Sequence, residues 1–377
     1  MIYLDANATT PCAPEVLDAM MPFFCERFGN ASSKHPLGQE AHDAVAKARL
    51  EVANLVGARP QEIVFTSGAT ESIHTAILGA LALFPDKNRV ISSQVEHPAT
   101  LMLLETLSQK GLKTTLLPVD RNGWLDHAAL EEALRRHEDT AIVSLLWANN
   151  ETGVLFPMED IAEVCARLKV PLHVDATQAL GRIACDLKAM PIDLLSFSAH
   201  KMHGPKGMGA LVVKKGLDLP PLLHGHQERR RRGGTENVPG IAGFGAASRL
   251  AGEKLSMMPK VARLRDALEK GVLGLFAKSF VNGMGAMRIA NTTSIAFPGT
   301  DAEELLFFLA KKGILASQGA ACAAGENAPS HVLLAMGLTP QEARSSVRFS
   351  LSWQTREEDL EAALSALADF IRMGEPA

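Results

Sequence analysis

The sequence of 377 residues has few cysteines, and their spacing matches no common cysteine framework. The five cysteines are an odd number, and no two of them are separated by only two residues. A disulfide framework uses an even set and a cysteine-rich zinc site uses closely spaced pairs, so neither kind of protein is indicated. We therefore predict free thiols in a reducing compartment, at Cys12, Cys25, Cys165, Cys185 and Cys322.

The sequence also lacks a long apolar run. No window is long enough to cross a bilayer. The first residues, MIYLDANATTPCAPEV, include Asp5 and show no basic stretch followed by an apolar one, which a secretory signal would have. We therefore expect a cytoplasmic protein without a membrane partner.

An excess of positive charge is missing as well. The formal net charge is -4, with 47% apolar and 21% charged residues, which is typical of globular proteins. No nucleic-acid partner is expected, because nothing in this balance creates a field that attracts polyanions. The one basic run, residues 229–232, is either a solvated face or a phosphate-facing segment, since GGTEN with Thr235 follows it at once.

What the sequence does contain is a regular alternation of two patterns. Short apolar runs alternate with amphipathic helical stretches between about residue 60 and residue 215. Strands that alternate with helices predict a mostly parallel sheet covered by helices on both faces, an α/β architecture. The expected strands lie at residues 62–65, 89–93, 114–119, 141–147, 171–175, 193–198 and 210–213.

The pattern changes after Pro239. A long helical stretch runs to about residue 277, an apolar run follows at NTTSIAF, and helical patterns return at DAEELLFFLAKKG and at the C-terminal end. A chain of this length exceeds one ordinary domain. The sequence therefore predicts a second, smaller α+β domain, with a boundary near residues 240–255.

Lys201 lies directly after an expected strand and before a glycine-containing loop. A surface lysine is the ordinary interpretation. However, the carboxyl ends of strands are where α/β sheets bind ligands, and a desolvated lysine amine can form a Schiff base. The glycines beyond it do not form a dinucleotide fingerprint, because Pro205 interrupts the turn.

Asp175 ends another expected strand, three residues before Gln178. Alone, this carboxylate could be a helix cap or a metal ligand. Together with Lys201 it suits pyridoxal phosphate, which needs a lysine on its aldehyde and an acidic partner on its pyridine nitrogen. The two strand-end residues predict such a site.

A phosphate group needs backbone N–H groups and hydroxyls at the start of a helix. The segment FTSGATES provides them, with Ala69 and Thr70 at a strand-to-helix turn, although its hydroxyls could equally be plain helix caps. His97 follows the next expected strand. It is either structural or placed to stack on a planar cofactor and exchange protons with the substrate.

Two residues of the second domain are further candidates. Cys322 lies in ASQGAACAAGENAPSH, which has no apolar periodicity and is typical of an exposed loop with an accessible thiol; a small core residue is the alternative. Arg348 alternates with apolar residues on an expected strand. Its guanidinium is either paired with an acid or available to bind a substrate carboxylate, and Arg344 is the competing candidate.

Taken in order, these segments resemble the NifS/IscS cysteine desulfurases, a family within the fold-type I pyridoxal-phosphate enzymes. The resemblance covers nearly the whole chain and is closest to the nitrogenase-associated NifS type. It implies a large cofactor-binding domain over residues 15–250, and a small domain over residues 1–14 and 251–377 with the cysteine loop. Its motifs are YLDANATT, FGNASSKH, FTSGATES, EHPA, WANNETG, HVDATQALG, SFSAHKMHGPKG, HQERRRRGGTEN, GAACAAGENAPSHV and SSVRFSLSW.

The resemblance implies roles for the matching residues. Lys201 is the Schiff-base lysine, Cys322 the nucleophile that becomes a persulfide, and His97 the acid-base group that also stacks on the ring. Asn149 and Arg348 bind the substrate L-cysteine. The expected cofactor-binding residues are Ala69, Thr70, His97, Asp175 on the pyridine nitrogen, Gln178 on the ring hydroxyl, Ser198, His200, Lys201, and Thr235 reaching across from the other subunit of a homodimer.

The same resemblance implies a destination for the sulfur. The persulfide would pass to an iron-sulfur scaffold or another sulfur acceptor protein, which serves either nitrogenase or general iron-sulfur assembly. A selenocysteine or cystine lyase on the same fold, or a sulfur carrier that keeps the cofactor without turnover, are the alternatives. The chain departs from the family pattern at Ala31, at Arg230 where glycine is common, before His226, and at residues 320, 323 and 324.

Overall fold

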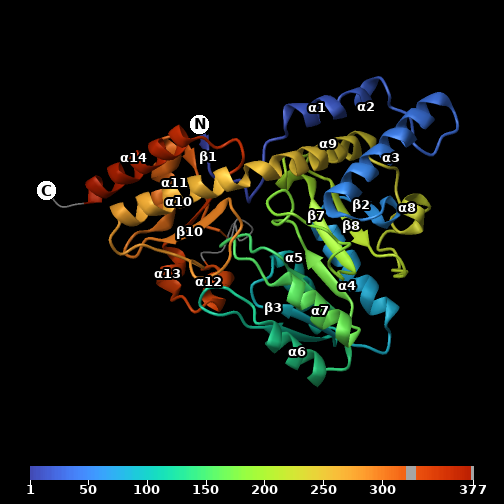
Figure 1. Cartoon of the computed structure of the whole chain (residues 1–377), viewed down its shortest axis with the longest axis horizontal. Coiled ribbons are helices and arrows are strands. Elements are labelled where there is room, and N and C mark those ends of the chain that lie inside the picture. Colours follow the sequence, from blue (N-terminus) through green and yellow to red (C-terminus); the bar gives the residue numbers. More distant parts are fainter. Residues whose placement is uncertain (320–327, 375–377) are drawn as a thin grey trace.

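The computed structural model describes residues 1–319 and 328–374 (Figure 1). Its largest element is a sheet of seven strands in the order β2-β8-β7-β6-β5-β3-β4. The strands are β2 (Ile63–Thr66), β3 (Arg89–Ser93), β4 (Lys113–Leu117), β5 (Thr140–Leu146), β6 (Leu172–Asp175), β7 (Leu194–Ser198) and β8 (Gly209–Val213).

The pairing in this sheet is mostly parallel. β4, β3, β5, β6 and β7 pair with one another in parallel, whereas β8 is antiparallel to both of its neighbours, β7 and β2. The predicted strands and the predicted mostly parallel sheet are therefore confirmed. Parallel pairing brings the carboxyl ends of β3, β5, β6 and β7 to one edge of the sheet.

The strands inside the sheet are buried on both faces, which explains why β5 and β8 are apolar along most of their length, whereas the edge strand β4 is largely exposed. Val64 packs with α4 and α5, while its neighbours Ile63 and Phe65 pack with α3 and α9 on the opposite face. Successive side chains alternate between faces because the strand repeat is two residues. The helices beside this sheet are α1 (Pro14–Met20), α2 (Pro22–Cys25), α3 (Pro36–Val56), α4 (Ala69–Leu83), α5 (Pro98–Ser108), α6 (His127–Arg136), α7 (Met158–Leu168), α8 (Gln227–Arg230) and α9 (Val238–Lys254).

A smaller group of strands and helices forms a second apolar core. Its antiparallel strands are in the order β12-β10-β9, and the N-terminal strand β1 pairs in parallel with β11. β1, drawn in blue, therefore lies among the orange and red C-terminal elements (Figure 1). These elements are β1 (Ile2–Tyr3), β9 (Phe280–Val281), β10 (Thr292–Ala296), β11 (Ile314–Leu315), β12 (Ser346–Ser350), α10 (Met258–Leu275), α11 (Ala302–Lys311) and α14 (Glu357–Gly374). The short helices α12 (His331–Ala335) and α13 (Pro340–Arg344) lie between β11 and β12 in the chain, but their buried apolar side chains pack with the core of the large sheet.

The long helical stretch expected after Pro239 consists of two α-helices. A short 3₁₀ turn, Leu255–Met257, separates α9 from α10. α9 packs on α3 beside the large sheet, whereas α10 packs on α14 and β10. The chain thus changes its packing partners at this turn, close to the predicted boundary. Among the described residues, no helix is long and apolar enough to span a membrane.

Candidate active site

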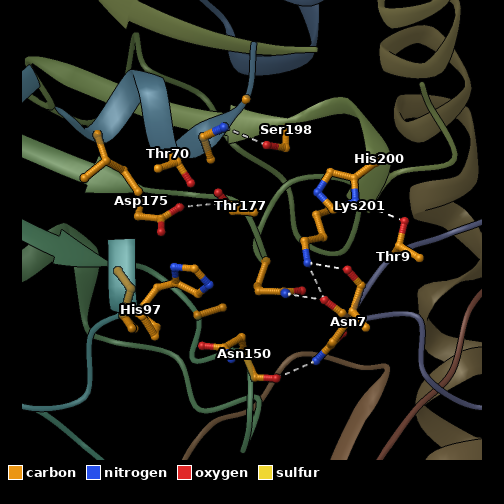
Figure 2. Close-up of a pocket in the computed structure, with 18 of the residues that line it drawn as sticks. Asn7, Thr9, Thr70, His97, Asn150, Asp175, Thr177, Ser198, His200 and Lys201 are labelled. Atoms are coloured by element: carbon orange, nitrogen blue, oxygen red, sulfur yellow. Dashed lines mark hydrogen bonds between the residues drawn. The ribbon is translucent and has the colours of Figure 1, made fainter. Parts of the chain in front are cut away.

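A cavity of about 810 Å³ lies at the carboxyl edge of the large sheet. The ends of β5, β6 and β7 form its floor, and the N-terminal segment around Asn7 and the C-terminal residues Gly319 and Arg348 close it from the other side. Ligands of open α/β sheets bind at this edge. Figure 2 shows that the labelled side chains converge on the cavity from segments far apart in the sequence.

Lys201 reaches the cavity from the 3₁₀ turn that follows β7. Its Nζ donates to the carbonyl oxygens of Asn7, at 2.6 Å, and Ala8, at 2.8 Å (Figure 2). These bonds hold the amine at the cavity wall, because a lysine side chain is otherwise free to rotate. Lys201 thus follows β7 and lines the cavity, and its role toward a ligand stays a prediction.

Asp175 is the last residue of β6 and is buried, with 7% of its surface exposed. Its Oδ1 accepts a hydrogen bond of 3.0 Å from the backbone N–H of Thr177 (Figure 2). The carboxylate lines the same cavity as Lys201. A negative charge and a primary amine therefore occupy one partly enclosed site.

Gln178 follows in the same turn. Its Nε2 donates to the carbonyl oxygen of Asn7 at 3.0 Å, and its Oε1 is buried without a hydrogen-bond partner among the described residues. Thr177 Oγ1 is likewise buried without a hydrogen-bond partner among the described residues. Buried polar atoms are almost always paired, so these two oxygens indicate the place of a ligand with hydrogen-bonding groups.

The first turn of α4 forms another part of the wall. The backbone N–H of Ala69 donates to Ser198 Oγ at 2.7 Å, and Thr70 lines the cavity beside it (Figure 2). Gly68 precedes them in extended backbone. The N-terminus of a 15-residue helix attracts an anion through its N–H groups and dipole, and two hydroxyls stand next to it.

His200 lies on the same side as this helix start. Its Nδ1 is 3.0 Å from Thr9 Oγ1 (Figure 2). Burial, together with the positive charge of Lys201, lowers the pKa of His200 to about 4. A neutral imidazole can donate one hydrogen bond and accept another, so His200 can serve an anionic group without adding a full charge.

His97 caps the N-terminus of α5 just beyond β3. Its Nδ1 accepts a hydrogen bond of 3.1 Å from the backbone N–H of Ala99, so the neutral ring carries its proton on Nε2. Burial lowers the pKa of His97 and the charge of Lys201 lowers it further, while Asp175 opposes both. His97 is therefore held neutral, with an N–H directed away from its own helix.

Arg348 lies on β12 and is buried, with 2% of its surface exposed. Nη2 donates to Asp5 at 2.7 Å, and Nη1 donates to the carbonyl oxygens of Asn150 and Gly319, both at 3.0 Å. Nε has no hydrogen-bond partner among the described residues. Of the two alternatives left open by the sequence, the structure shows the pairing with an acid, and binding of a substrate carboxylate stays a prediction.

Asn149 is placed differently from the other predicted residues. It is buried, its Nδ2 donates to Val95 O at 3.1 Å, and its Oδ1 accepts from the backbone N–H groups of Glu151 and Thr152. It forms the turn after β5, and Asn150 and Glu151 line the cavity in that turn. The Asn149 amide is therefore engaged by the backbone in this structure, and its substrate-binding role stays a prediction.

Thr235 is exposed and is not among the residues that line this cavity. Cys322 falls outside the described residues. Other residues line the cavity although no sequence pattern indicated them. These are Asn7, Thr9, Asn150, Glu151, Gly319 and His331; most of them stand in quoted motifs, but nothing in their spacing places them together.

Comparison with known proteins gives a consistent picture. The family model described as "Aminotransferase class-V" matches residues 2–363. A protein from Sinorhizobium fredii named "Cysteine desulfurase" is 46% identical over 375 residues, covering 98% of this chain and 96% of the relative. The match therefore extends across both cores of the structure.

Solved structures agree in fold. A structure described as "NIFS-LIKE PROTEIN" superposes with a TM-score of 0.92 at 37% identity, covering 99% of both chains. Another, described as "SspA in complex with cysteine", has a TM-score of 0.82 at 35% identity, covering 93% of this chain and 99% of its own. The arrangement of strands and helices is shared along nearly the full length.

Proposed function

We infer that this chain, which belongs to the class-V aminotransferase family, is a cysteine desulfurase. Its fold is that of the fold-type I pyridoxal-phosphate enzymes. The observation that carries the inference is the convergence of Lys201, Asp175 and His97 on one cavity from the ends of three strands. The 46% identity to a named cysteine desulfurase supports the same reaction.

The cavity offers what pyridoxal 5'-phosphate requires. An amine, a carboxylate and a helix N-terminus with hydroxyls match its aldehyde, its pyridine nitrogen and its phosphate. Gln178 Oε1 and Thr177 Oγ1, buried without partners among the described residues, match a ligand that has hydrogen-bonding groups. Lys201 would bind the aldehyde, Asp175 the ring nitrogen and Gln178 the ring hydroxyl. The groups facing the phosphate would be Ala69, Thr70, Ser198 and His200.

Bound there, the cofactor supplies an electron sink for the negative charge that remains when a proton leaves the α-carbon of an amino acid. The side chains of this protein supply the rest. His97 exchanges a proton with the substrate at Nε2, because Nδ1 is occupied by Ala99. Lys201 is the second proton carrier, placed at the cavity wall by the carbonyl oxygens of Asn7 and Ala8.

Arg348 would bind the carboxylate of L-cysteine. Its Nε is a buried donor without a partner among the described residues, and Nη2 lies beside it, so one edge of the guanidinium can donate to two carboxylate oxygens. Asp5 keeps the guanidinium in this orientation. The substrate would thus be fixed between the C-terminal strands and the edge of the large sheet.

Cys322 is the proposed sulfur acceptor. Its thiolate attacks the sulfur of L-cysteine, a sulfur-sulfur bond forms, the carbon-sulfur bond breaks, and its electron pair stays on the carbon that takes up a proton. The net reaction converts L-cysteine and the Cys322 thiol into L-alanine and a persulfide. Such a thiol must remain reduced between turnovers, which suits the cytoplasm.

The test is alanine release from L-cysteine by the purified protein, with the visible absorption of bound cofactor recorded for each variant. We expect Cys322→Ala to keep the cofactor band and to lose turnover, because only the acceptor is removed. Lys201→Ala should lose the band and turnover together. If Cys322→Ala released alanine at the wild-type rate, a lyase that needs no acceptor thiol would be the correct assignment.

We further propose a homodimer that passes its sulfur to an iron-sulfur scaffold or another acceptor protein. Thr235 is exposed and is not among the residues that line the cavity of its own chain, which suits a residue that reaches the cofactor of a second copy. Large apolar side chains are exposed on and next to α1 and α2, as expected of a surface that another chain covers. They are Leu17, Met21, Phe24 and Phe28.

A further inference from the structure

One buried carboxyl group meets both ends of the segment that contains Cys322. Ser330 Oγ donates to Glu151 Oε2 at 2.5 Å. Gly319 lies against the same oxygen, so closely that a Cβ added to Gly319 would be 2.8 Å from it. Residue 319 precedes the segment and residue 330 follows it, and Glu151 comes from the turn after β5. A single side chain beside the large sheet therefore contacts both ends.

Other bonds hold these ends in the same place. The carbonyl oxygen of Gly319 accepts from Arg348 Nη1 at 3.0 Å. Ser330 Oγ also accepts from the backbone N–H of Leu333 and so caps α12. His331 Nε2 lies 2.9 Å from the carbonyl oxygen of Glu96, to which it donates. Each end is thus fixed to elements that line the cavity.

Glu151 is itself held rigidly. Its backbone N–H donates to Asn149 Oδ1 at 2.9 Å, and Asn149 Nδ2 donates to Val95 O beyond β3. The Glu151 side chain is buried, with 3% of the residue exposed. The position of its carboxyl group is therefore set by the edge of the large sheet and not by the segment that it contacts.

We propose that Glu151 and Ser330 are positioning residues for the sulfur-transfer step. By holding the two ends of the segment at the cavity, they determine where the Cys322 thiol meets the sulfur of the substrate. This inference rests on the proposed function, in which Cys322 accepts the sulfur. It assigns to Glu151 no contact with the reacting atoms.

The protonation of Glu151 decides which variants are informative. Burial raises the pKa of this carboxyl, although the Ser330 hydroxyl and the charges of His331 and Arg348 lower it in part. Burial thus favours the neutral acid, whose shape and acceptor oxygen a glutamine reproduces. Glu151→Gln should therefore keep the bond from Ser330, whereas Glu151→Ala and Ser330→Ala remove it.

The experiment compares two reactions of the full-length, cofactor-loaded protein. The first is alanine release from L-cysteine, which needs an acceptor thiol. The second is chloride release from β-chloro-L-alanine, in which the carbon-chlorine bond breaks with its electron pair on chloride, and water converts the remainder to pyruvate and ammonia. This second reaction uses the cofactor site but needs no thiol.

We expect Glu151→Ala and Ser330→Ala to lower kcat for alanine release by about 100-fold, the effect of an approximately 1 Å misplacement of reacting groups. Chloride release should stay close to the wild-type rate, because the groups that hold the cofactor are untouched. Glu151→Gln should retain most of both activities. A merely structural defect would slow the two reactions together.

Thr339→Ala is the matched control. Thr339 also caps a short helix, α13, and also bonds a carboxylate, Glu342 at 2.9 Å, but it lies outside the cavity. We expect it to leave both reactions unchanged. Parallel loss of both reactions in Glu151→Ala and Ser330→Ala, or full alanine release in both, would overturn the inference alone. Wild-type alanine release in Cys322→Ala would overturn the proposed function and the inference with it.

Discussion

At the scale of single residues, the buried carboxyl group of Glu96, next to His97, leads to a prediction about pH. It is buried, with 1% of its surface exposed, and burial raises the pKa of its carboxyl from 4.5 to about 8, although the Ser93 hydroxyl opposes this. Between these two values the folded protein holds a proton that the unfolded chain has lost. The stability that Glu96 contributes is therefore present below about pH 4.5 and is lost as the pH rises towards 8.

The measurement is the free energy of unfolding of the wild type and of Glu96→Gln at several pH values inside this window. We expect the wild type to lose about 1.4 kcal/mol per pH unit relative to the variant, because glutamine cannot titrate. Equal pH dependence of the two proteins would show that Glu96 is ionised in the folded state.

The sequence predicts single side chains at strand ends better than side chains that meet through space. The positions of Lys201, Asp175 and His97 could be predicted because each lies at or just after the end of an apolar run, and parallel strands end at one edge of the sheet. The contact of Glu151 could not be predicted, because its partner Ser330 is 179 residues away. The backbone bonds of the Asn149 amide were not predicted either, and its role toward a substrate stays a prediction.

At the scale of elements, the alternation of apolar runs and helical stretches predicts the large sheet, because the strands inside the sheet are buried on both faces. The sequence gives no comparable signal for backbone conformation in the basic run. Glu228, Arg229 and Arg230 all have positive φ angles in the structure, the last at 65°. Arg230 is the position where the related family commonly has glycine, and the left-handed backbone provides the physical reason.

Arg230→Gly should therefore stabilise the protein. A non-glycine residue in the left-handed region destabilises the folded protein by about 1 kcal/mol, and glycine removes this strain. Glycine also increases the conformational entropy of the unfolded chain, which offsets part of the gain. The neighbouring Arg231, with a φ of -95°, offers the control, since glycine there relieves nothing and should destabilise. Chemical denaturation of the three proteins measures the difference, and a loss of stability in Arg230→Gly would contradict the prediction.

At the scale of the whole molecule, the cavity belongs to neither apolar core alone. Asp175 and Lys201 follow strands of the large sheet, while Arg348 lies on the small one and bonds Asn150 from the other side. Asn7, near the N-terminus, accepts from Lys201 across 194 positions of the sequence. The sequence predicted two domains, but composition and periodicity do not indicate which chain ends close the site between them.

This arrangement predicts that an amino acid bound in the cavity stabilises both cores together. L-Alanine, the proposed product, has the carboxylate that would satisfy Arg348 Nε and the amino group that belongs at the cofactor near Lys201. In the cofactor-loaded protein it should therefore raise the free energy of unfolding, by about 1.4 kcal/mol for each tenfold increase of free ligand above its Kd. Thermal unfolding at increasing L-alanine concentration measures this effect.

Two controls separate this effect from general solute stabilisation. D-Alanine has the same groups in mirror-image order. It cannot place its carboxylate at Arg348 while its nitrogen and α-hydrogen occupy the positions that they have in bound L-alanine. D-Alanine should therefore raise the free energy of unfolding by less than L-alanine does. Cys322→Ala should respond to L-alanine as the wild type does, because the acceptor thiol makes no contribution to binding the product. Equal stabilisation by both enantiomers would contradict the prediction, because it would mean that Arg348 does not bind the carboxylate. Binding of the amino acid would then not depend on contacts with both sides of the cavity at once.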